Sequence, residues 1–370
     1  MKGVILVGGL GTRLRPLTCN TPKPMLPLVN RPFIETMITR LRDSGIDEII
    51  LAVQYLAERF VETLGDGSRL GVKLHIVEEP EPRGTAGAVK NVEHLLDGTT
   101  FIFNGDVMTD LDLQSMLSFH RERGAKVTIA LTPVEDPTQF GLVEMDANGS
   151  VQRFLEKPRP EEITTNLINA GTYIVEPEIF DLVPANQFYM FERGLFPSLL
   201  QRGDPMFGFP SKAYWTDIGK PQTYLEVHHD ILIGKAHMPI SGKEIAPRVW
   251  AEGEVQIAPG VELVGPIVIG AGTRIDGGAK VIGPTVIGKN VEIGAEAVVE
   301  GAVIWDNNVI GPSAHIHHAM IGSHNQIGAH TTVSEGAIVS DQCAIGPENR
   351  LERGIRLWPG THLGERAVSF

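Results

Sequence analysis

The spacing of hydrophobic and polar residues differs between the first and the last part of the chain. From residue 1 to about residue 230, short apolar runs alternate with segments in which apolar residues recur at helical spacing. The apolar runs predict strands over Val4–Val7, Glu48–Val53, Leu74–Val77, Phe101–Phe103 and Val127–Leu131. Strands that alternate with helices indicate an α/β domain with a mixed, mostly parallel sheet.

A helix between the first two strands is predicted by apolar residues at helical spacing: Ile34, Met37, Ile38 and Leu41. Asn30 is a candidate N-cap for this helix, and Gly45 is a stop signal. Ligands of open parallel sheets bind beyond the carboxyl ends of the strands. We therefore expect the chemistry in the loops that follow Val7 and Phe103.

After about residue 250 a six-residue period replaces the helical one. Apolar residues occupy every sixth position in three registers separated by slips of one residue: 257, 263, 269, 275, 281, 287, 293 and 299, then 304, 310 and 316, then 321, 327, 333, 339, 345 and 351. At 42% apolar content, eight consecutive hits would arise by chance about once in a thousand trials, so the period is structural.

Each six-residue unit is expected to point one aliphatic side chain inward at a corner. Glycine suits the turn that follows, and it occupies positions 270, 288, 294, 311, 322, 328 and 346. The pattern resembles the hexapeptide-repeat, left-handed parallel β-helix, with the handedness implied by that resemblance alone. We expect a first domain over residues 1–231, a connection over 232–250 and the β-helix over 251–370.

The composition of the chain restricts the molecules it is expected to bind and the compartment it is expected to occupy. The net charge of −13 disfavours nucleic acid, because binding a phosphate backbone requires a basic surface. The cysteines, Cys19 and Cys343, are far apart in sequence, which argues against a disulfide framework and fits a reducing cytoplasm. The run Val4–Val7 is too short for a signal segment or a membrane span. An anionic ligand would need a local basic pocket.

Such a pocket is predicted directly after the first strand. Gly8, Gly9 and Gly11 allow backbone N–H groups to approach an anion, and Arg13 and Lys23 supply the positive charge that a triphosphate requires. Prolines at 22, 24 and 27 stiffen the segment that carries the lysine. The spacing fits neither a dinucleotide-binding fingerprint nor a P-loop.

Residues 8–28, GGLGTRLRPLTCNTPKPMLPL, resemble the signature of the sugar-phosphate nucleotidyltransferases, the nucleotide-sugar pyrophosphorylase family. The resemblance implies a Rossmann-like catalytic domain joined to the β-helix. It also implies that the nucleotide is held by residues of the first strand, the glycine-rich loop and a later segment: Leu6, Gly8, Gly9, Gly11, Thr12, Arg13, Glu79, Gly84 and Thr85. Lys23 would contact phosphate.

Two aspartates are candidates for binding Mg²⁺. Asp106 follows the apolar strand Phe101–Phe103, and Asp217 lies in the string Trp-Thr-Asp-Ile-Gly. Either one alone could be a loop cap or a solvated turn residue. Mg²⁺ prefers one or two carboxylates together with substrate phosphates. The family resemblance implies that the two aspartates act as a metal-binding pair.

The sugar-phosphate side is predicted at a hairpin, Gly141–Met145 and Val151–Leu155, that ends in Glu156-Lys157-Pro158. A Glu-Lys pair is by itself usually a surface charge pair. The resemblance implies that Lys157 contacts the phosphate of the sugar and that Glu156 binds sugar hydroxyls. It adds the string Asn169-Ala170-Gly171, so the predicted sugar contacts are Gly141, Glu156, Lys157, Asn169 and Gly171, with Glu192 as a weaker candidate.

The implied reaction is attack by an oxygen of a sugar 1-phosphate on the α-phosphorus of a nucleoside triphosphate, with pyrophosphate leaving. The nucleophile is already an anion, so catalysis is positioning and charge neutralisation by Arg13, Lys23, Asp106, Lys157 and Asp217 with Mg²⁺. A carboxylate at Glu79 or Glu81 could accept hydrogen bonds from the N1–H and amino groups of guanine. We therefore expect the two substrates to be GTP and mannose 1-phosphate.

Other functions remain open at this stage. The enzyme could be a thymidylyl- or uridylyltransferase that acts on glucose 1-phosphate. Hexapeptide helices also occur in acyltransferases, and several histidines here could serve such an activity: His315, His317, His318, His324 and His330. A regulatory subunit that only binds nucleotide sugar is a third alternative. We assign the β-helix to homo-oligomerisation, and we expect the first domain alone to retain transfer, because every site candidate precedes residue 220.

Overall fold

The computed structural model describes residues 1–369, which form two compact units. The first unit comprises Met1–Leu10 and Ile34–Asp217. The second unit combines Gly11–Phe33 with the chain from Ile218 onward. The glycine-rich signature is therefore divided, since Gly8 and Gly9 belong to the first unit and the residues from Gly11 onward to the second.

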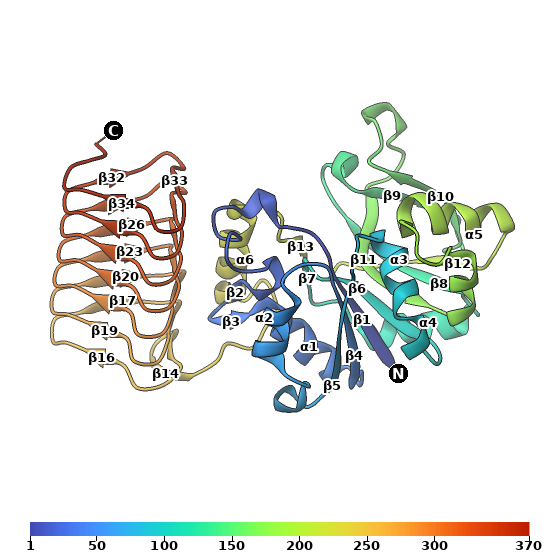
Figure 1. Cartoon of the computed structure of the whole chain (residues 1–370), viewed down its shortest axis with the longest axis horizontal. Coiled ribbons are helices and arrows are strands. Elements are labelled where there is room, and N and C mark those ends of the chain that lie inside the picture. The colour runs from blue at the N-terminus through green and yellow to red at the C-terminus, as the bar shows by residue number, and fades with distance from the viewer. Residues whose placement is uncertain (370) are drawn as a thin grey trace. The chain divides into compact units, whose positions relative to one another are not determined.

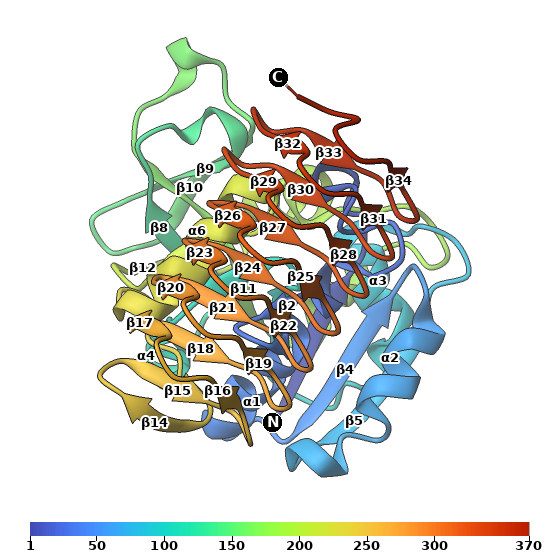
Figure 2. The same cartoon turned by 90° about the vertical axis from the view of Figure 1, so that its left-hand side faces the viewer.

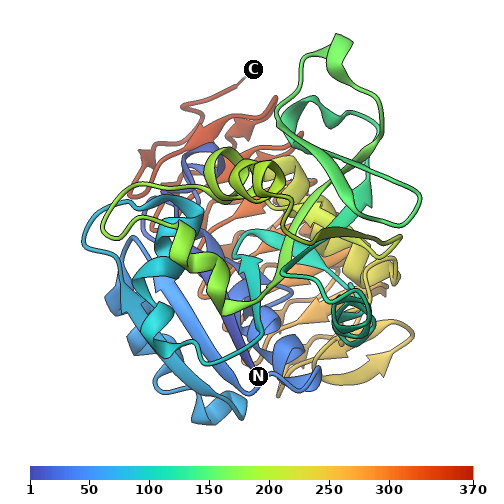
Figure 3. The same cartoon turned by 90° about the vertical axis from the view of Figure 1, so that its right-hand side faces the viewer.

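A nine-stranded mixed sheet is the centre of the first unit (Figures 1 and 3). The order is β10-β9-β11-β6-β1-β4-β5, with β8 beside β11 and β12 beside β8. Neighbours within β6-β1-β4-β5 are parallel, whereas β11 is antiparallel to β6, β8 and β9. The strands are β1 Lys2–Val7, β4 Glu48–Val53, β5 Lys73–Glu78, β6 Thr100–Asn104, β8 Val127–Pro133, β9 Gly141–Met145, β10 Val151–Glu156, β11 Leu167–Val175 and β12 Met206–Pro210.

The five strands and the hairpin predicted from apolar runs are confirmed, with ends that differ by at most two residues. The helices are α1 Phe33–Asp43, α2 Ala57–Leu64, α3 Gly84–Asn91, α4 Leu113–Glu122, α5 Phe196–Arg202 and α6 Pro221–Ile233. Two small antiparallel pairs complete the elements before the β-helix: β2 Pro27–Leu28 with β3 Arg31–Pro32, and β7 Val107–Thr109 with β13 Trp215–Asp217.

Helix α1 confirms the predicted apolar face, because Ile34, Ile38 and Leu41 are buried. The predicted Asn30 cap is wrong, since the helix begins at Phe33. The Asn30 side chain instead donates to the Glu252 carboxylate at 2.9 Å and to a backbone carbonyl at 2.8 Å, both within the second unit. The side chain is thus held by tertiary contacts within the second unit, three residues before the helix begins.

The second unit contains a parallel β-helix with three long sheets (Figures 1 and 2). The first sheet is β14 Lys243–Ala246, β15 Val249–Ala251, β18 Ile267–Ile269, β21 Thr285–Ile287, β24 Val303–Ile304, β27 Met320–Ile321, β30 Ile338–Val339 and β33 Arg356–Leu357. The second is β16 Gln256–Ile257, β19 Arg274–Ile275, β22 Glu292–Ile293, β25 Val309–Ile310, β28 Gln326–Ile327, β31 Ala344–Ile345 and β34 His362–Leu363. The third is β17 Glu262–Val264, β20 Lys280–Ile282, β23 Val298–Glu300, β26 His315–His317, β29 Thr332–Val333 and β32 Arg350–Leu351.

The six-residue period predicts the interior of the β-helix. The periodic positions from Ile269 to Leu351 are all buried in one hydrophobic cluster. Ile257 is instead 37% exposed and Leu263 is only partly buried, because the first coil has a neighbouring coil on one side only. Each slip of one residue is a shortened coil, as the register Val299 to Ile316 to Val333 shows.

The segment expected to connect the domains already contains regular structure. Strand β14 pairs antiparallel with β15, and β15 starts the stack by pairing with β18. Among the described residues, none of the helices combines the length and the apolar character that crossing a membrane requires.

Candidate functional site

The ends of β1 and β6 are joined at the place where chemistry was expected. These strands are parallel neighbours, with Leu6 paired to Asn104. Beyond the pair, the Gly105 N–H donates to the Leu6 carbonyl at 2.9 Å, and a Cβ at position 105 would lie 2.6 Å from that oxygen. Only glycine permits this approach, which sets the turn carrying Asp106 beside the start of the glycine-rich loop.

The first part of the glycine-rich loop is held by a residue that the sequence analysis missed. The Gln54 side-chain oxygen accepts a hydrogen bond from the Gly9 N–H at 3.2 Å, and Gly9 has a φ of 99°. Gln54 directly follows β4, the parallel neighbour of β1. The rule that sites lie beyond the carboxyl ends of parallel strands therefore pointed to this residue as well.

The second part of the loop folds back so that Gly11 and Lys23 meet. Thr18 donates its hydroxyl to the Gly11 carbonyl at 2.7 Å. Gly11 has a φ of 59°, and a Cβ there would lie 3.3 Å from the Lys23 Cβ. Thr12 and Arg13 lie in an exposed 3₁₀ turn, Thr12–Leu14. The two predicted basic residues thus flank a compact glycine turn in the second unit.

One candidate metal ligand of the first unit, Asp217, lies on β13, and the other, Asp106, directly precedes the strand that pairs with it, β7. In the β7–β13 ladder, Asp217 is opposite Val107, which is the residue after Asp106. Both aspartates are half-buried. The ladder is fixed further by Trp215, whose indole N–H donates to the Ala170 carbonyl at 2.9 Å. The ladder therefore brings the backbone positions of the two aspartates, which are distant in sequence, close to each other.

This pair fits a divalent cation that is shared with a phosphate substrate. Mg²⁺ usually takes one or two protein carboxylates and completes its shell with water and phosphate oxygens. Within residues 1–369, three or more His, Cys, Asp or Glu side chains do not gather as a metal-binding group.

The predicted sugar-phosphate residues meet at the end of the β9–β10 hairpin. Gly141 is paired with Glu156, and a Cβ at position 141 would lie 3.2 Å from the Glu156 carboxylate and 2.6 Å from the Phe154 ring. Lys157 has a φ of 53°, and its N–H donates to the Phe140 carbonyl at 2.9 Å. Its side chain is exposed. This turn conformation sets the direction in which the exposed lysine leaves the end of the hairpin.

The string Asn169-Ala170-Gly171 forms an irregularity in β11. The pairing of β11 with β8 shifts register between Asn169 and Tyr173. Gly171 has a φ of 70°, and its N–H donates to the Asn169 side chain at 2.9 Å, while the Asn169 amide donates to the Tyr173 hydroxyl at 2.8 Å. Bulges of this kind redirect side chains next to active sites.

Tyr173, which the sequence analysis did not single out, packs in the core beneath the predicted sugar segment. Its side chain is fully buried. Burial raises the pKa of its phenol, and the carboxylates of Glu192, Glu156 and Asp106 raise it further. The hydroxyl also accepts a hydrogen bond from Asn169, so the predicted sugar segment is anchored to a buried side chain.

The segment proposed for base selection is partly buried. Glu79 is buried and accepts a hydrogen bond from the Arg83 N–H at 3.3 Å, whereas Glu81 is exposed. Burial raises the pKa of Glu79. Gly84 has a φ of 70°, and a Cβ there would lie 2.8 Å from a backbone oxygen of Tyr189. The turn into α3 is therefore restricted to glycine.

The weaker candidate Glu192 lies beside the predicted nucleotide residues. It belongs to a π-helical turn, Phe191–Leu195, a feature often found at functional sites. Its carboxylate accepts the Thr85 hydroxyl at 2.9 Å. Burial raises its pKa, as does the charge of Glu156. Glu192 thus links Thr85 with the sugar side.

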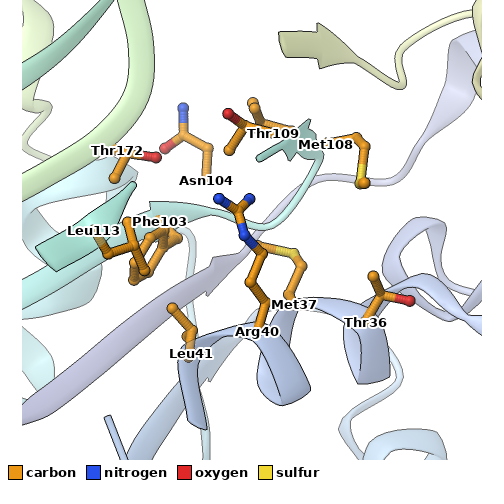
Figure 4. A pocket seen from close by; sticks show the side chains of 11 residues that line it. Thr36, Met37, Arg40, Leu41, Phe103, Asn104, Met108, Thr109, Leu113 and Thr172 are labelled. Carbon is orange, nitrogen blue, oxygen red and sulfur yellow. The ribbon is translucent and has the colours of Figure 1, made fainter. Parts of the chain in front are cut away.

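A small cavity is lined by residues on either side of the Asp106 turn, among them Asn104 and Met108 (Figure 4). The Arg40 guanidinium points into the space between Asn104 and Thr109. Burial lowers the Arg40 pKa to about 10, although Asp110 and Asp112 oppose the change. The Asn104 side-chain oxygen is buried without a hydrogen-bond partner. With a volume of about 30 Å³ the cavity suits an ordered water and is too small for a substrate.

Two family models match the chain. The model described as "Nucleotidyl transferase" matches residues 2–233, and the model described as "EIF2B subunit epsilon LbH domain" matches residues 247–351.

All five histidines that were considered for an acyltransferase activity are exposed: His315, His317, His318, His324 and His330.

Several characterised relatives are similar over most of the chain. A mannose-1-phosphate guanylyltransferase of Mycobacterium tuberculosis is 39% identical over 75% of this chain and 79% of its own length. A UTP–glucose-1-phosphate uridylyltransferase of Synechocystis is 35% identical over 93% of this chain and 92% of its own. A mannose-1-phosphate guanylyltransferase catalytic subunit beta of Drosophila pseudoobscura pseudoobscura is 34% identical over 93% and 91%.

Among solved structures, HddC from Yersinia pseudotuberculosis, complexed with GMP-PN, is similar to part of the chain. The identity is 30% and the TM-score 0.53, over 61% of this chain and 97% of that one. Nucleotidyltransferases of this family generally use a divalent metal. The chain therefore belongs to the nucleotidyl transferase family and is a sugar-phosphate nucleotidyltransferase with a C-terminal left-handed β-helix.

Proposed function

We propose that the enzyme transfers a guanylyl group from GTP to mannose 1-phosphate and releases pyrophosphate. An oxygen of the sugar phosphate forms a bond to the α-phosphorus, and the bond from that phosphorus to the bridging oxygen breaks, with the electron pair leaving on pyrophosphate. The product is GDP-mannose. The similarity to the guanylyltransferase of M. tuberculosis, 39% identical, carries the choice of both substrates.

Glu79 supports the choice of guanine. A buried carboxylate loses its hydration, and a guanine base offers two donors, N1–H and the amino group, that replace it. Uracil and thymine offer one N–H donor. Because burial raises the pKa of Glu79, the donors would also favour its charged form when the base is bound. Glu81 is exposed and offers no such desolvated acceptor.

The nucleotide is assigned to residues at the end of β1 and to the base segment. Backbone N–H groups of the glycine-rich loop approach the phosphates, while Arg13 and Lys23 neutralise the charge that develops during transfer. The proposed nucleotide-binding set is Leu6, Gly8, Gly9, Gly11, Thr12, Arg13, Lys23, Glu79, Gly84 and Thr85. The closeness of Gly11 to Lys23 supports this set.

We assign Mg²⁺ as the divalent ion, held by Asp106 and Asp217. The ion would screen the phosphate charges and polarise the α-phosphate when bound. The two aspartates would orient it, and the pairing of Asp217 with Val107, the residue after Asp106, supports this assignment.

The sugar phosphate is assigned to the hairpin and the bulge. Lys157 holds the attacking phosphate against its repulsion by the triphosphate, and this positioning contributes to the acceleration. The Glu156 carboxylate accepts hydrogen bonds from sugar hydroxyls, and the Asn169 amide makes further hydrogen bonds to them. Gly141 and Gly171 leave room for the ring. The pairing of Gly141 with Glu156 supports the grouping.

A second candidate function is uridylyl transfer to glucose 1-phosphate, favoured by the Synechocystis relative that matches 93% of the chain. We further propose a cytoplasmic homo-oligomer that binds neither nucleic acid nor membrane, with catalytic residues 1–231, a connection 232–250 and a β-helix 251–370. The net charge supports the exclusion of nucleic acid, and the family matches support two sequence modules.

The test is a substrate panel. Four nucleoside triphosphates are combined with mannose, glucose and N-acetylglucosamine 1-phosphates, and pyrophosphate release is measured with Mg²⁺. GTP with mannose 1-phosphate should give the largest kcat/KM. A larger value for UTP with glucose 1-phosphate would replace the proposal by the second candidate. Glu79→Gln should reduce kcat/KM for GTP more than for UTP, because an amide accepts through one oxygen only, whereas Glu81→Gln should change neither.

A further inference from the structure

The segment that carries Arg13 and Lys23 is bonded to the last coils of the β-helix. Within the second unit, the Ser340 hydroxyl donates to the Pro16 carbonyl at 2.9 Å, and the Arg356 guanidinium donates to the Arg15 carbonyl at 3.0 Å. Both donors lie at strands that are neighbours in one sheet, β30 and β33. They contact the segment two to three residues after Arg13.

The position that Ser340 occupies varies between the coils of this sheet, and three other coils carry Glu252, Trp305 and Trp358 there. In several coils of this sheet, the position after the inward aliphatic residue is glycine, as at Gly270, Gly288 and Gly322. Ser340 occupies the same position after Val339, is fully buried, and directs its hydroxyl to the Pro16 carbonyl. A buried hydroxyl without a partner would cost stability, so the segment completes this site.

A second set of contacts holds the far end of the segment. The Tyr224 hydroxyl of α6 donates to the Pro27 carbonyl, and the Trp305 indole N–H donates to that hydroxyl at 3.2 Å. The amide of Asn30 is bonded to Glu252. Lys23 lies between the two sets, and its Cβ is close to the Gly11 turn. The basic part of the loop is therefore fixed on both sides by residues of the second unit.

We propose that Ser340 and Arg356 are positioning residues for triphosphate binding. By fixing the Arg15 and Pro16 carbonyls, they hold the backbone on which Arg13 and Lys23 are presented, so the β-helix contributes to the affinity for nucleotide. The proposal rests on the proposed function of this loop. It gives the last coils a role in addition to assembly.

The test uses the full-length protein and compares the KM values of the two substrates. Ser340→Ala and Arg356→Ala should each raise KM for GTP about fivefold, the effect of one hydrogen bond, and the double variant should raise it further. KM for mannose 1-phosphate should stay within about twofold, because the lost hydrogen bonds support the nucleotide side alone. Arg356→Lys keeps a donor and should restore most of the affinity.

Two matched variants serve as controls. Ser334 follows the inward Val333 in a different sheet, at the position that corresponds to Ser340. Arg350 is exposed and paired with Glu352 at 3.0 Å. Ser334→Ala and Arg350→Ala should leave both KM values unchanged. Equal increases for both substrates, or equal effects of the control variants, would show a general loss of structure and overturn the proposal.

Hydrogen exchange supplies a readout that does not depend on the reaction. The amides of Leu17 and Cys19 donate to carbonyls within the segment at 3.1 and 3.2 Å. Their exchange should accelerate in Ser340→Ala and Arg356→Ala and stay unchanged in the controls. If the wild-type enzyme uses GTP but both variants keep its KM for GTP and its exchange rates, the positioning role is rejected and the proposed function stands. If exchange accelerates in the variants but the wild-type protein does not use GTP, the proposed function is rejected and the contact between the segment and the last coils stands.

Discussion

The carbonyl of Leu6 and the N–H of Gly105 are joined by a 2.9 Å hydrogen bond between the ends of two parallel strands. This bond connects the strand that enters the glycine-rich loop with the turn that carries Asp106. A Cβ at position 105 would lie 2.6 Å from the backbone oxygen of Leu6. This oxygen cannot move without moving β1. The geometry of the candidate site is thus sensitive to a single methyl group.

Gly105→Ala should therefore reduce both turnover and stability. A Cβ in van der Waals conflict with backbone typically costs about 1–3 kcal/mol, and the shift reaches Asp106 directly. Gly98→Ala is the matched control, because a Cβ there would meet no atom within 4 Å. Pyrophosphate release and urea unfolding are the measurements. Equal behaviour of the two variants would contradict the described packing.

Asp106→Asn and Asp217→Asn should each lose at least about tenfold in kcat, or about 1.4 kcal/mol of transition-state stabilisation. An amide keeps the shape of the side chain but removes the charge that binds the ion. Asp43→Asn, at an exposed residue paired with Arg42, is the control for loss of one negative charge. Turnover is measured across a Mg²⁺ titration, and near-normal rates at saturating Mg²⁺ would remove the metal assignment.

Lys157→Ala should raise KM for mannose 1-phosphate by about tenfold or more, because charge-assisted contacts to phosphate are the strong class of hydrogen bond. KM for GTP should change much less. Arg159→Ala, an exposed neighbour paired with Glu161 and Glu162, controls for general loss of positive charge. The reverse pattern of KM values would assign Lys157 to the nucleotide.

Glu192→Gln should change how stability depends on pH. The folded-state pKa of Glu192 is raised, so its contribution is fully present below the ordinary glutamate pKa. It is lost as pH rises through the folded-state value, with a slope of up to about 1.4 kcal/mol per pH unit between the two values. The glutamine does not titrate, so the stability of the variant relative to the wild type should increase with pH.

Urea unfolding of both proteins between pH 4 and pH 8 checks this expectation. Glu161→Gln, at an exposed glutamate, should show no such trend. A difference between Glu192→Gln and the wild type that is independent of pH would indicate that the carboxyl does not titrate over this range.

Much of the fold could be predicted because its signals are local. Apolar runs predict β1, β4 and β6, and the six-residue period predicts the interior of the β-helix, since both depend on which side chains face inward. The bulge at Asn169–Tyr173 could not be predicted in this way. It depends on how β11 meets β8, and nothing in the string itself encodes that register.

Site residues with local sequence signals could likewise be predicted, whereas those that depend on distant neighbours could not. Residues in contiguous strings, such as Gly8–Arg13 and Glu156-Lys157, could be selected from the sequence together with the family resemblance. Tyr173 and Gln54 were missed because their importance arises from neighbours that are distant in sequence. The expectation that residues 1–231 suffice for transfer counted only side chains of the site. It left out the backbone contacts of Arg15 and Pro16 with the last coils.

The grouping of Gly11–Phe33 with the C-terminal chain bears on how such enzymes can be recombined. A chimera made by joining the first 231 residues of one relative to the repeats of another keeps each sequence module intact. It nevertheless places one parent's loop on the other parent's coils. A chimera that takes residues 11–33 and the repeats from the same parent keeps the contacts between them. The segment to be exchanged therefore consists of two stretches that are separate in the sequence.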